Sequence, residues 1–240
     1  TSNIMAKFEI KDGVAIIPEG TTCIQSKTFS FCRSLKSIAI PKGVTKIGSS
    51  AFYYCTLLES VTIPEGVTII EEATFRNNTS LKSITIPESV TCIEDYAFFG
   101  CTSLESVTIP EGVTEIGECA FYDCTSLKNI IIPEGVTGIV YRTFCNCSSL
   151  KEIIIPESVT EIGSRAFHCC TLIESITIPE GVTKIEEGTF YNCTLLKEIT
   201  VPEGVTVIGK EAFCGCSSLK SITIPKSVTK IERSAFSGCT

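Results

Sequence analysis

Apolar and polar residues alternate along this chain in a pattern that repeats every 23 residues from end to end. One unit reads Leu-x-x-Ile-x-Ile-Pro-x-x-Val-Thr-x-Ile-Gly-x-x-Ala-Phe-x-x-Cys, as in residues 35–55. All ten prolines fall in one column of the repeat, and a column of phenylalanines runs from Phe29 to Phe236. A period of roughly 20 to 50 residues is typical of stacked units that bury their apolar faces against one another. The pattern therefore predicts one elongated repeat solenoid.

Two stretches of each unit alternate polar and β-branched residues, which predicts short half-buried strands. The first precedes the proline, as in residues 37–40, and the second is the Val-Thr-x-Ile segment, as in residues 44–47. Stacking makes both ladders parallel and the coil right-handed, and proline ends the first strand because it cannot donate to a ladder. The next segment, residues 48–52, predicts a short helical or 3-10 turn whose phenylalanine enters the core.

The unit quoted above resembles the BspA-like subfamily of leucine-rich repeats, which is named for a bacterial surface antigen. The resemblance covers residues 12–240 and implies a right-handed leucine-rich-repeat coil of about ten turns. Its parallel β-sheet would form the concave face, with short helical or 3-10 turns or extended segments on the convex side. The family implies surface-exposed proteins that bind host or matrix proteins. Ordinary leucine-rich repeats carry Asn where Gly43 or Ser89 stand here, so no asparagine ladder is expected.

The first turn departs from the repeat, which predicts a leader and cap over residues 1–11 and a single domain over residues 12–240. Phe8 and Ile10 can fold over the open end of the first turn, because terminal repeats need a specially packed outer face. If Met5 is the native start, the protein is cytoplasmic, whereas the family resemblance implies a secreted or cell-surface protein.

The last turn ends without a cap and would expose apolar residues, among them Ile224 and Ile231. Either the array continues beyond Thr240 or another molecule covers that end. End-to-end self-association through the uncapped turn is one such arrangement.

Charge and hydropathy exclude two classes of function. A net charge of -7 with scattered Lys and Arg argues against binding of nucleic acid, which needs clustered cations. No stretch approaches the roughly 18 uninterrupted apolar residues that cross a bilayer, so membrane insertion is not expected.

The 15 cysteines suggest a disulfide scaffold at first sight, but nine of them occupy one column, three residues after the Phe. Asn78 fills the tenth place of that column. Such a column is a packing position, where Cys acts as a small buried hydrophobe. Stacked equivalents lie about 4.8 Å apart, farther than the roughly 3.8 Å between Cβ atoms that a disulfide prefers. We therefore expect free thiols.

The chain offers little material for catalysis, because it has one histidine, no tryptophan and three aspartates, each in a different column. His168 has no aspartate in its own or a neighbouring turn, so we expect an ordinary surface histidine and no enzyme. Cys145, His168 and Cys169 lie on adjacent turns and would suit zinc, yet the chain has no Cys-x-x-Cys pair. We expect no metal and no cofactor. Four asparagines lie in glycosylation sequons but are also typical of turns: Asn77, Asn78, Asn146 and Asn192.

The outward-facing positions of the first strand of each unit are nearly all Ser or Thr. The departures cluster on two neighbouring turns and add an amide, an acid and two exposed apolar side chains: Asn129, Ile131, Glu152 and Ile154. An exposed apolar spot on such a face is a candidate contact site for a protein partner.

The residue after each proline is Glu in seven consecutive turns. Stacked like charges about 5 Å apart in water repel by roughly 0.8 kcal/mol per pair before salt screening. The row is either a tolerated consequence of repeat duplication or an acidic stripe for a basic partner. Its central members are candidate partner-binding residues: Glu111, Glu134, Glu157 and Glu180.

We therefore predict a non-catalytic recognition module that presents a β-sheet surface to a protein partner of basic character, as in adhesion. The alternative is a structural scaffold or surface-layer repeat protein without a dedicated ligand.

Overall fold

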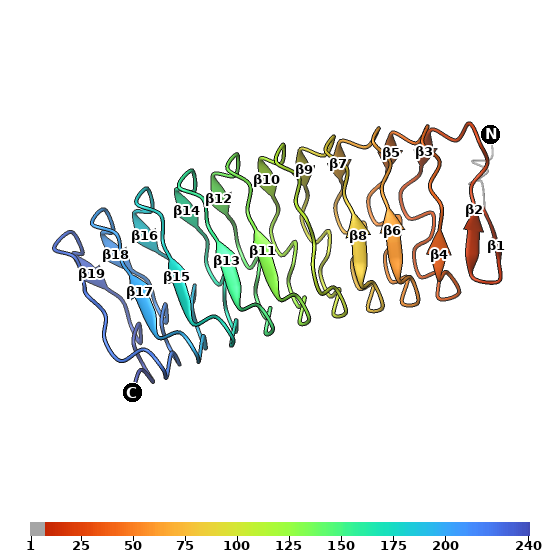
Figure 1. Cartoon of the computed structure of the whole chain (residues 1–240). Helices are drawn as coiled ribbons and strands as arrows, with labels where there is room; N and C mark the ends of the chain where they lie inside the picture. The colour runs from red at the N-terminus through yellow and green to blue at the C-terminus, as the bar shows by residue number, and fades with distance from the viewer. Residues whose placement is uncertain (1–7) are drawn as a thin grey trace.

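Pairing between successive turns builds the fold of residues 8–240, the part of the chain that this computed structural model describes (Figure 1). In the first ladder, Asn129 pairs with Glu152 and Ser175 pairs with Glu198, which confirms the predicted parallel register of 23 residues. The strands on this side, which we call the main sheet, are β2 (Val14–Ile16), β4 (Ser37–Ile38), β6 (Ser60–Thr62), β8 (Ser83–Thr85), β11 (Asn129–Ile131), β13 (Glu152–Ile154), β15 (Ser175–Thr177) and β17 (Glu198–Thr200). They pair in four separate groups: β2 with β4, β6 with β8, β11 with β13, and β15 with β17.

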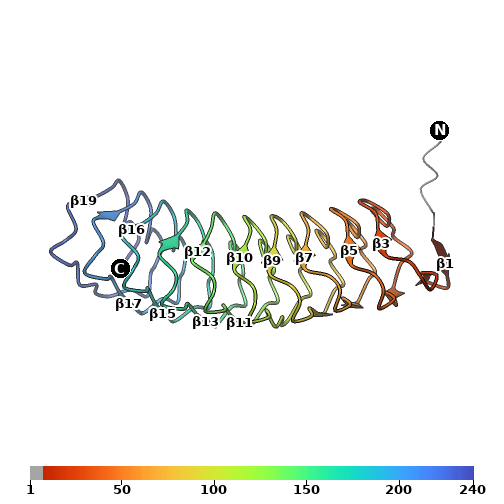
Figure 2. The ribbon, with the colours of Figure 1, turned by 90° about the horizontal axis from the view of Figure 1, so that it is seen from above.

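The Val-Thr-x-Ile segments form the predicted second ladder, which is also parallel. It lies on another side of the coil from the main sheet (Figure 2). Its strands are β3 (Cys23–Ile24), β5 (Lys46–Ile47), β7 (Ile69–Ile70), β9 (Cys92–Ile93), β10 (Glu115–Ile116), β12 (Gly138–Ile139), β14 (Glu161–Ile162), β16 (Lys184–Ile185), β18 (Val207–Ile208) and β19 (Lys230–Ile231).

The segment that carries the phenylalanine is a chain of tight turns, and residues 8–240 contain no helix. Ser50 and Tyr54 have φ angles of 57° and 59°, in the left-handed region, which interrupts any helical path. Amides alternate between two partners: Tyr53 N donates to Ser50 O at 3.1 Å, whereas Phe52 N donates to Thr74 O of the next turn at 3.0 Å. The turns therefore replace the helical or 3-10 segments considered from the sequence, because every second amide bonds to the neighbouring coil.

The phenylalanine column forms a continuous stack through the interior. Successive rings from Phe29 to Phe236 lie with centroids 5.3 to 5.8 Å apart and nearly parallel planes. Parallel rings at this separation are offset rather than face to face, which is the favourable arrangement of their quadrupoles. Because rings such as Phe121 are fully buried, we attribute about 3–5 kcal/mol of stability to each by analogy with Phe-to-Ala substitutions.

The cysteine column adds a directional contact that the packing argument did not include. Cys124 Sγ donates to Phe98 O at 3.2 Å, and Cys147 Sγ donates to Phe121 O at 3.1 Å, so each thiol reaches back to the preceding turn. Asn78 does the same with an amide, donating from Nδ2 to Phe52 O at 2.7 Å. The column is therefore a ladder of weak S–H donors with one stronger N–H donor. All 15 cysteines are free thiols.

An antiparallel strand closes the first turn. β1 (Glu9–Lys11) pairs with β2 so that Ile10 faces Ala15, and Phe8 stacks on Phe29 with centroids 5.7 Å apart. This confirms that Phe8 and Ile10 cover the first turn. Met5 and the rest of residues 1–7 lie outside the described residues. At the other end Ile231, in β19, is 51% exposed, as expected for the outer face of the last turn.

The column position of Asn78 gives a direct test of the ladder. Asn78→Ala should lower the free energy of unfolding by about 1–3 kcal/mol, because it removes buried hydrogen bonds to carbonyls. Asn78→Cys should restore most of this loss, since a thiol occupies the same column elsewhere and Asn78 Oδ1 is buried without a partner among the described residues.

Urea unfolding followed by circular dichroism measures the free energy of unfolding of both variants. The matched control is Thr79→Ala, a substitution at the neighbouring exposed residue. Equal stability of Asn78→Ala and the wild type would contradict a stabilising role for the Asn78 hydrogen bonds.

Candidate protein-interaction surfaces

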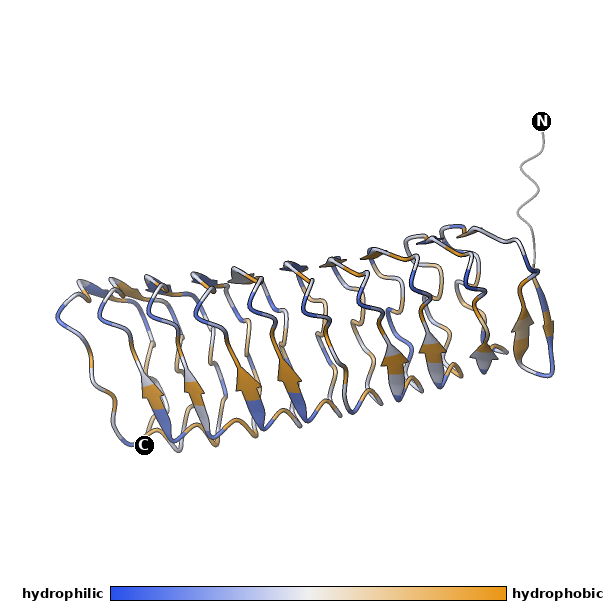
Figure 3. Ribbon diagram, turned by 45° about the horizontal axis from the view of Figure 1, so that its top comes forward, coloured by the Kyte–Doolittle hydropathy of each residue, from blue (hydrophilic) through white to orange (hydrophobic). Residues whose placement is uncertain are grey.

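The residues that replace Ser and Thr at the outward positions lie side by side on β11 and β13. Asn129 pairs with Glu152, and Ile131 pairs with Ile154 in the same register. Both isoleucine side chains are 65% exposed, which makes them the most exposed large apolar residues among those the structure describes. In Figure 3 the arrows of β11 and β13 are orange to the tip, whereas those of β15 and β17 have pale tips. We name these four residues the β11/β13 patch.

The surface beside the patch is different in character. Equivalent positions on the neighbouring strands of the main sheet are threonines, such as Thr85 and Thr177. One column to the side, Lys128 pairs with Glu105 at 2.7 Å and Lys197 pairs with Glu174 at 2.8 Å. Charges of opposite sign on neighbouring turns of this column therefore form ion pairs. The Lys128 ammonium beside Glu105 lowers the pKa of that carboxyl group through a hydrogen bond and its charge.

The glutamates that follow the prolines all project into solvent. A tight turn positions each of them, as Val113 N donates to Pro110 O at 3.0 Å across Glu111 and Gly112. Within residues 8–240 none of their carboxylates makes an ion pair, so the row is an uncompensated acidic stripe. We name it the glutamate stripe; its members are Glu65, Glu88, Glu111, Glu134, Glu157, Glu180 and Glu203.

Aromatic and arginine side chains stack along the outside of the phenylalanine turns. The Arg76 guanidinium lies 4.5 Å from the Phe99 ring centroid and 5.1 Å from that of Tyr96. Phe99 in turn stacks on Tyr122 at 4.6 Å. The signal was present in the sequence, because all but Tyr96 occupy the column that follows the phenylalanine.

His168 stacks on Tyr191 in the same outer row, with ring centroids 4.5 Å apart. Burial, followed by the charges of Arg165 and Arg142, lowers the pKa of His168. The neighbouring Cys145 is buried. Across the residues that the structure describes, no group of three His, Cys, Asp or Glu side chains is placed to hold a metal ion.

Three of the four sequon asparagines have a backbone role. Asn77, Asn146 and Asn192 adopt φ angles of 60°, 62° and 54°, and Asn tolerates this left-handed region better than most residues. Asn78 is fully buried, which makes it inaccessible to a glycosylating enzyme in the folded protein.

The repeat itself matches a known family. The model of the BspA type leucine rich repeat region, in six copies, matches residues 13–128 and 114–240. This chain belongs to the BspA-type leucine-rich repeat family. The match spans nearly the whole solenoid, so the resemblance inferred from the 23-residue unit is confirmed. No curated protein matches the chain at a significant level.

Solved structures of bacterial leucine-rich repeat proteins share the BspA-type fold. A leucine rich cell surface protein from Faecalibacterium prausnitzii A2-165 is 37% identical with a TM-score of 0.63, covering 93% of this chain and 68% of its own. The T. pallidum leucine rich repeat protein is 30% identical with a TM-score of 0.64, covering 72% of this chain and 90% of its own. The pneumococcal vaccine antigen PcpA is 25% identical with a TM-score of 0.65, over 93% of this chain and 66% of its own.

Over residues 8–240 no helical segment has the length and apolar character needed to cross a bilayer.

The thiols of the repeat should differ in reactivity according to their place in the coil. Burial raises the pKa of Cys55, Cys101 and Cys216 to about 12, and burial raises that of Cys124 and its neighbours in the column well above the usual value. Because only the thiolate reacts, these column cysteines should resist iodoacetamide at about pH 8. Half-buried Cys23 and Cys214 should be alkylated first.

From the sequence, Cys23, Cys92 and Cys214 are all expected to react more readily than the column cysteines, because they lie outside that column. Cys92 should nevertheless react more slowly than the other two. Burial, followed by the neighbouring charges of Glu115 and Glu94, raises its pKa to about 11, which reduces its thiolate fraction. Peptide mass spectrometry of a time course measures each site, and alkylation in urea supplies the fully reactive reference. Rapid native labelling of Cys124 would contradict the buried ladder.

Proposed function

We propose that this BspA-type solenoid is a non-catalytic recognition module that binds a protein partner through the β11/β13 patch. The observation that carries the proposal is the pair of isoleucines, Ile131 and Ile154, which are both 65% exposed and lie in register on adjacent strands. Large apolar side chains at the centre of an interface contribute most of the binding free energy because they are fully desolvated there, whereas the polar rim contributes less. The surrounding Ser and Thr side chains suit such a rim.

The glutamate stripe supports a partner of basic character. A row of uncompensated carboxylates steers a basic partner toward the surface and raises the association rate, an effect that salt screens. Apolar contact acts mainly after encounter and sets the dissociation rate. The two surfaces therefore predict separate kinetic signatures for one partner.

The family context supports a role in adhesion at the cell surface. The similar chain from Faecalibacterium prausnitzii A2-165 is described as a cell surface protein, and a further similar chain is a vaccine antigen. We extend that setting to this protein as part of the proposal.

A scaffold or surface-layer role without a dedicated ligand is the second candidate. It is favoured by the mostly Ser and Thr surface of the main sheet outside β11 and β13, since dedicated binding surfaces vary from turn to turn. The other exceptions are Glu198 on β17 and the exposed Val14 and Ile16 on β2. The β11/β13 patch is the feature that this candidate leaves without a role.

Two pairs of substitutions test the proposal by surface plasmon resonance against a partner recovered by affinity capture. Ile131→Ser with Ile154→Ser should mainly speed dissociation, because it removes the apolar contact. Glu134→Lys with Glu157→Lys should slow association at low salt and have less effect at high salt, because screening already weakens steering there.

The matched control is Thr177→Ser with Thr200→Ser, which changes equivalent positions on β15 and β17. Binding that neither the isoleucine nor the glutamate variants alter would place recognition elsewhere on the solenoid, for example on the outer aromatic row.

A further inference from the structure

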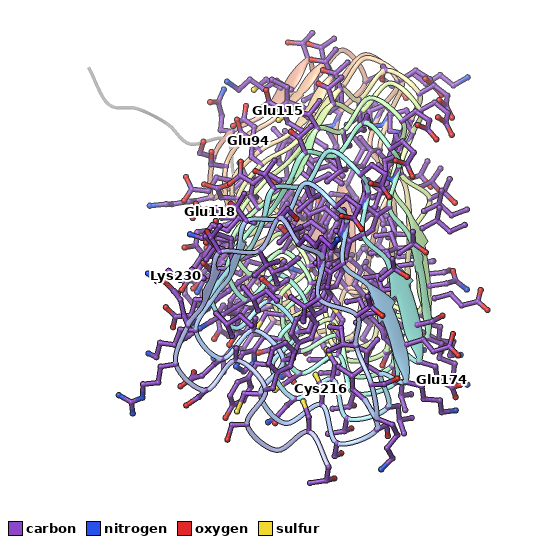
Figure 4. The ribbon with its side chains drawn as sticks, turned by 90° about the vertical axis from the view of Figure 1, so that its left-hand side faces the viewer. Glu94, Glu115, Glu118, Glu174, Cys216 and Lys230 are labelled. Atoms are coloured by element: carbon purple, nitrogen blue, oxygen red, sulfur yellow. The ribbon has the colours of Figure 1, made fainter. Side chains whose placement is uncertain are left out.

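The second ladder carries a groove of about 660 Å³ on its outer surface. It extends across five turns, from β7 to β14, and opens to solvent on a different side of the coil from the β11/β13 patch. Figure 4 shows Glu94, Glu115 and Glu118 on one side of the solenoid and Glu174, beside the main sheet, on the other. Six acidic side chains line the groove: Glu72, Glu94, Asp95, Glu115, Glu118 and Glu161.

A glycine creates the hollow at the centre of the groove. Gly138 occupies the outward position of β12, where the adjacent strands carry Glu115 and Glu161. An added Cβ would meet no heavy atom closer than 3.9 Å, so the local fold does not require glycine there. The missing side chain leaves a gap between Glu115 and Glu161, whose strands lie about 10 Å apart, twice the spacing of neighbouring strands.

Toward both ends of the second ladder, lysine side chains pair with the acidic side chains, whereas in the groove at its centre they do not. Lys46 pairs with Glu71 at 3.3 Å, and Lys184 pairs with Glu186 at 2.8 Å, each from the second ladder. In the groove, none of the six acids forms an ion pair within residues 8–240.

Two of these acids have a structural partner in the backbone. Asp95 Oδ1 accepts from Glu118 N at 2.7 Å, and Glu94 Oε2 accepts from Glu72 N at 2.9 Å. Glu115 and Glu161 accept no backbone hydrogen bond among the described residues; the one side-chain contact is weak, from Cys92 Sγ to Glu115 Oε2 at 3.9 Å. Both carboxylates can therefore pair with a cationic group of a partner.

No arginine or lysine is among the described residues that line the groove. Arg76 lies over the rings of Tyr96 and Phe99, and Arg142 lies 4.9 Å from the ring centroid of Tyr141, so both stack on the outer aromatic row.

We propose that this groove binds an extended basic segment of a protein partner, with one Lys or Arg side chain over Gly138 between Glu115 and Glu161. The site is independent of the β11/β13 patch and extends the recognition surface to a second side of the solenoid. Five turns span about 19 Å, which matches roughly six residues of an extended chain. A long cationic side chain fits the gap because its stem can lie along the glycine while its charged end reaches a carboxylate.

Other occupants fit the groove less well. A bound cation needs several oxygen ligands around one point, and no three acidic groups of the described residues converge in that way. A second copy of this chain carries the same net charge of -7 and offers no clustered basic segment.

Fluorescence anisotropy with a labelled peptide of alternating Arg and Ser tests the proposal at low salt. Glu115→Gln with Glu161→Gln should weaken binding about fivefold, the effect of losing two exposed ion pairs. Gly138→Lys should weaken it at least as much, because the chain then supplies its own cation at a position where β5 and β16 already carry lysine.

Glu9→Gln with Glu19→Gln in the first turn is the control, since it makes the same change in net charge away from the groove. We expect the control variant to bind the Arg and Ser peptide with unchanged affinity and the groove variants to bind it more weakly. A peptide of alternating Glu and Ser should not bind. Equal weakening by both glutamine pairs would show non-specific attraction and overturn the proposal. If calcium chloride displaced the peptide much more strongly than sodium chloride at the same ionic strength, the groove would be a cation site. That result would also overturn the proposal.

Discussion

Hydrogen bonding from each turn to the next is the constraint on which the rest of this solenoid depends. In the phenylalanine segment, one amide closes the local turn and the following amide reaches the next coil, as Tyr53 N and Phe52 N do. This alternation holds the coils in register, so the phenylalanine rings must stack. The thiol of Cys124 then reaches the carbonyl of Phe98 in the preceding turn. Ring, thiol and backbone therefore form one repeating unit.

A scaffold built in this way leaves its outward positions free to vary without loss of stability. Most outward positions of the main sheet nevertheless keep Ser or Thr, and the clearest exceptions are on β11 and β13. On the second ladder the exception is Gly138, which opens a groove between carboxylates. Both departures lie near the middle of the described chain. We interpret them as two recognition surfaces carried by adjoining turns of one rigid coil.

The sequence period was sufficient for the fold, because every turn repeats the same apolar columns. It predicted both ladders and the buried rings. The departure of the first turn from the period suggested that Phe8 and Ile10 fold over it, and Phe8 stacks on Phe29. It did not predict the turn geometry, because apolar spacing cannot distinguish a helical turn from turns interrupted by left-handed residues. Asn, Asp and Gly before the cysteine column, as at Asn146, were the available signal. The groove also escaped prediction, because it depends on a missing side chain in one turn and on carboxylates from four others.

Amide hydrogen exchange measured at single residues tests the inter-turn register most directly. The amides of Phe98 and Phe121, which donate to the next turn at 2.8 and 3.0 Å, should be among the slowest to exchange. Those of Glu111 and Gly112, in the exposed turn after Pro110, should exchange rapidly under the same conditions. Exchange of Phe98 and Phe121 as fast as that of Glu111 and Gly112 would contradict a solenoid held together by bonds between its turns.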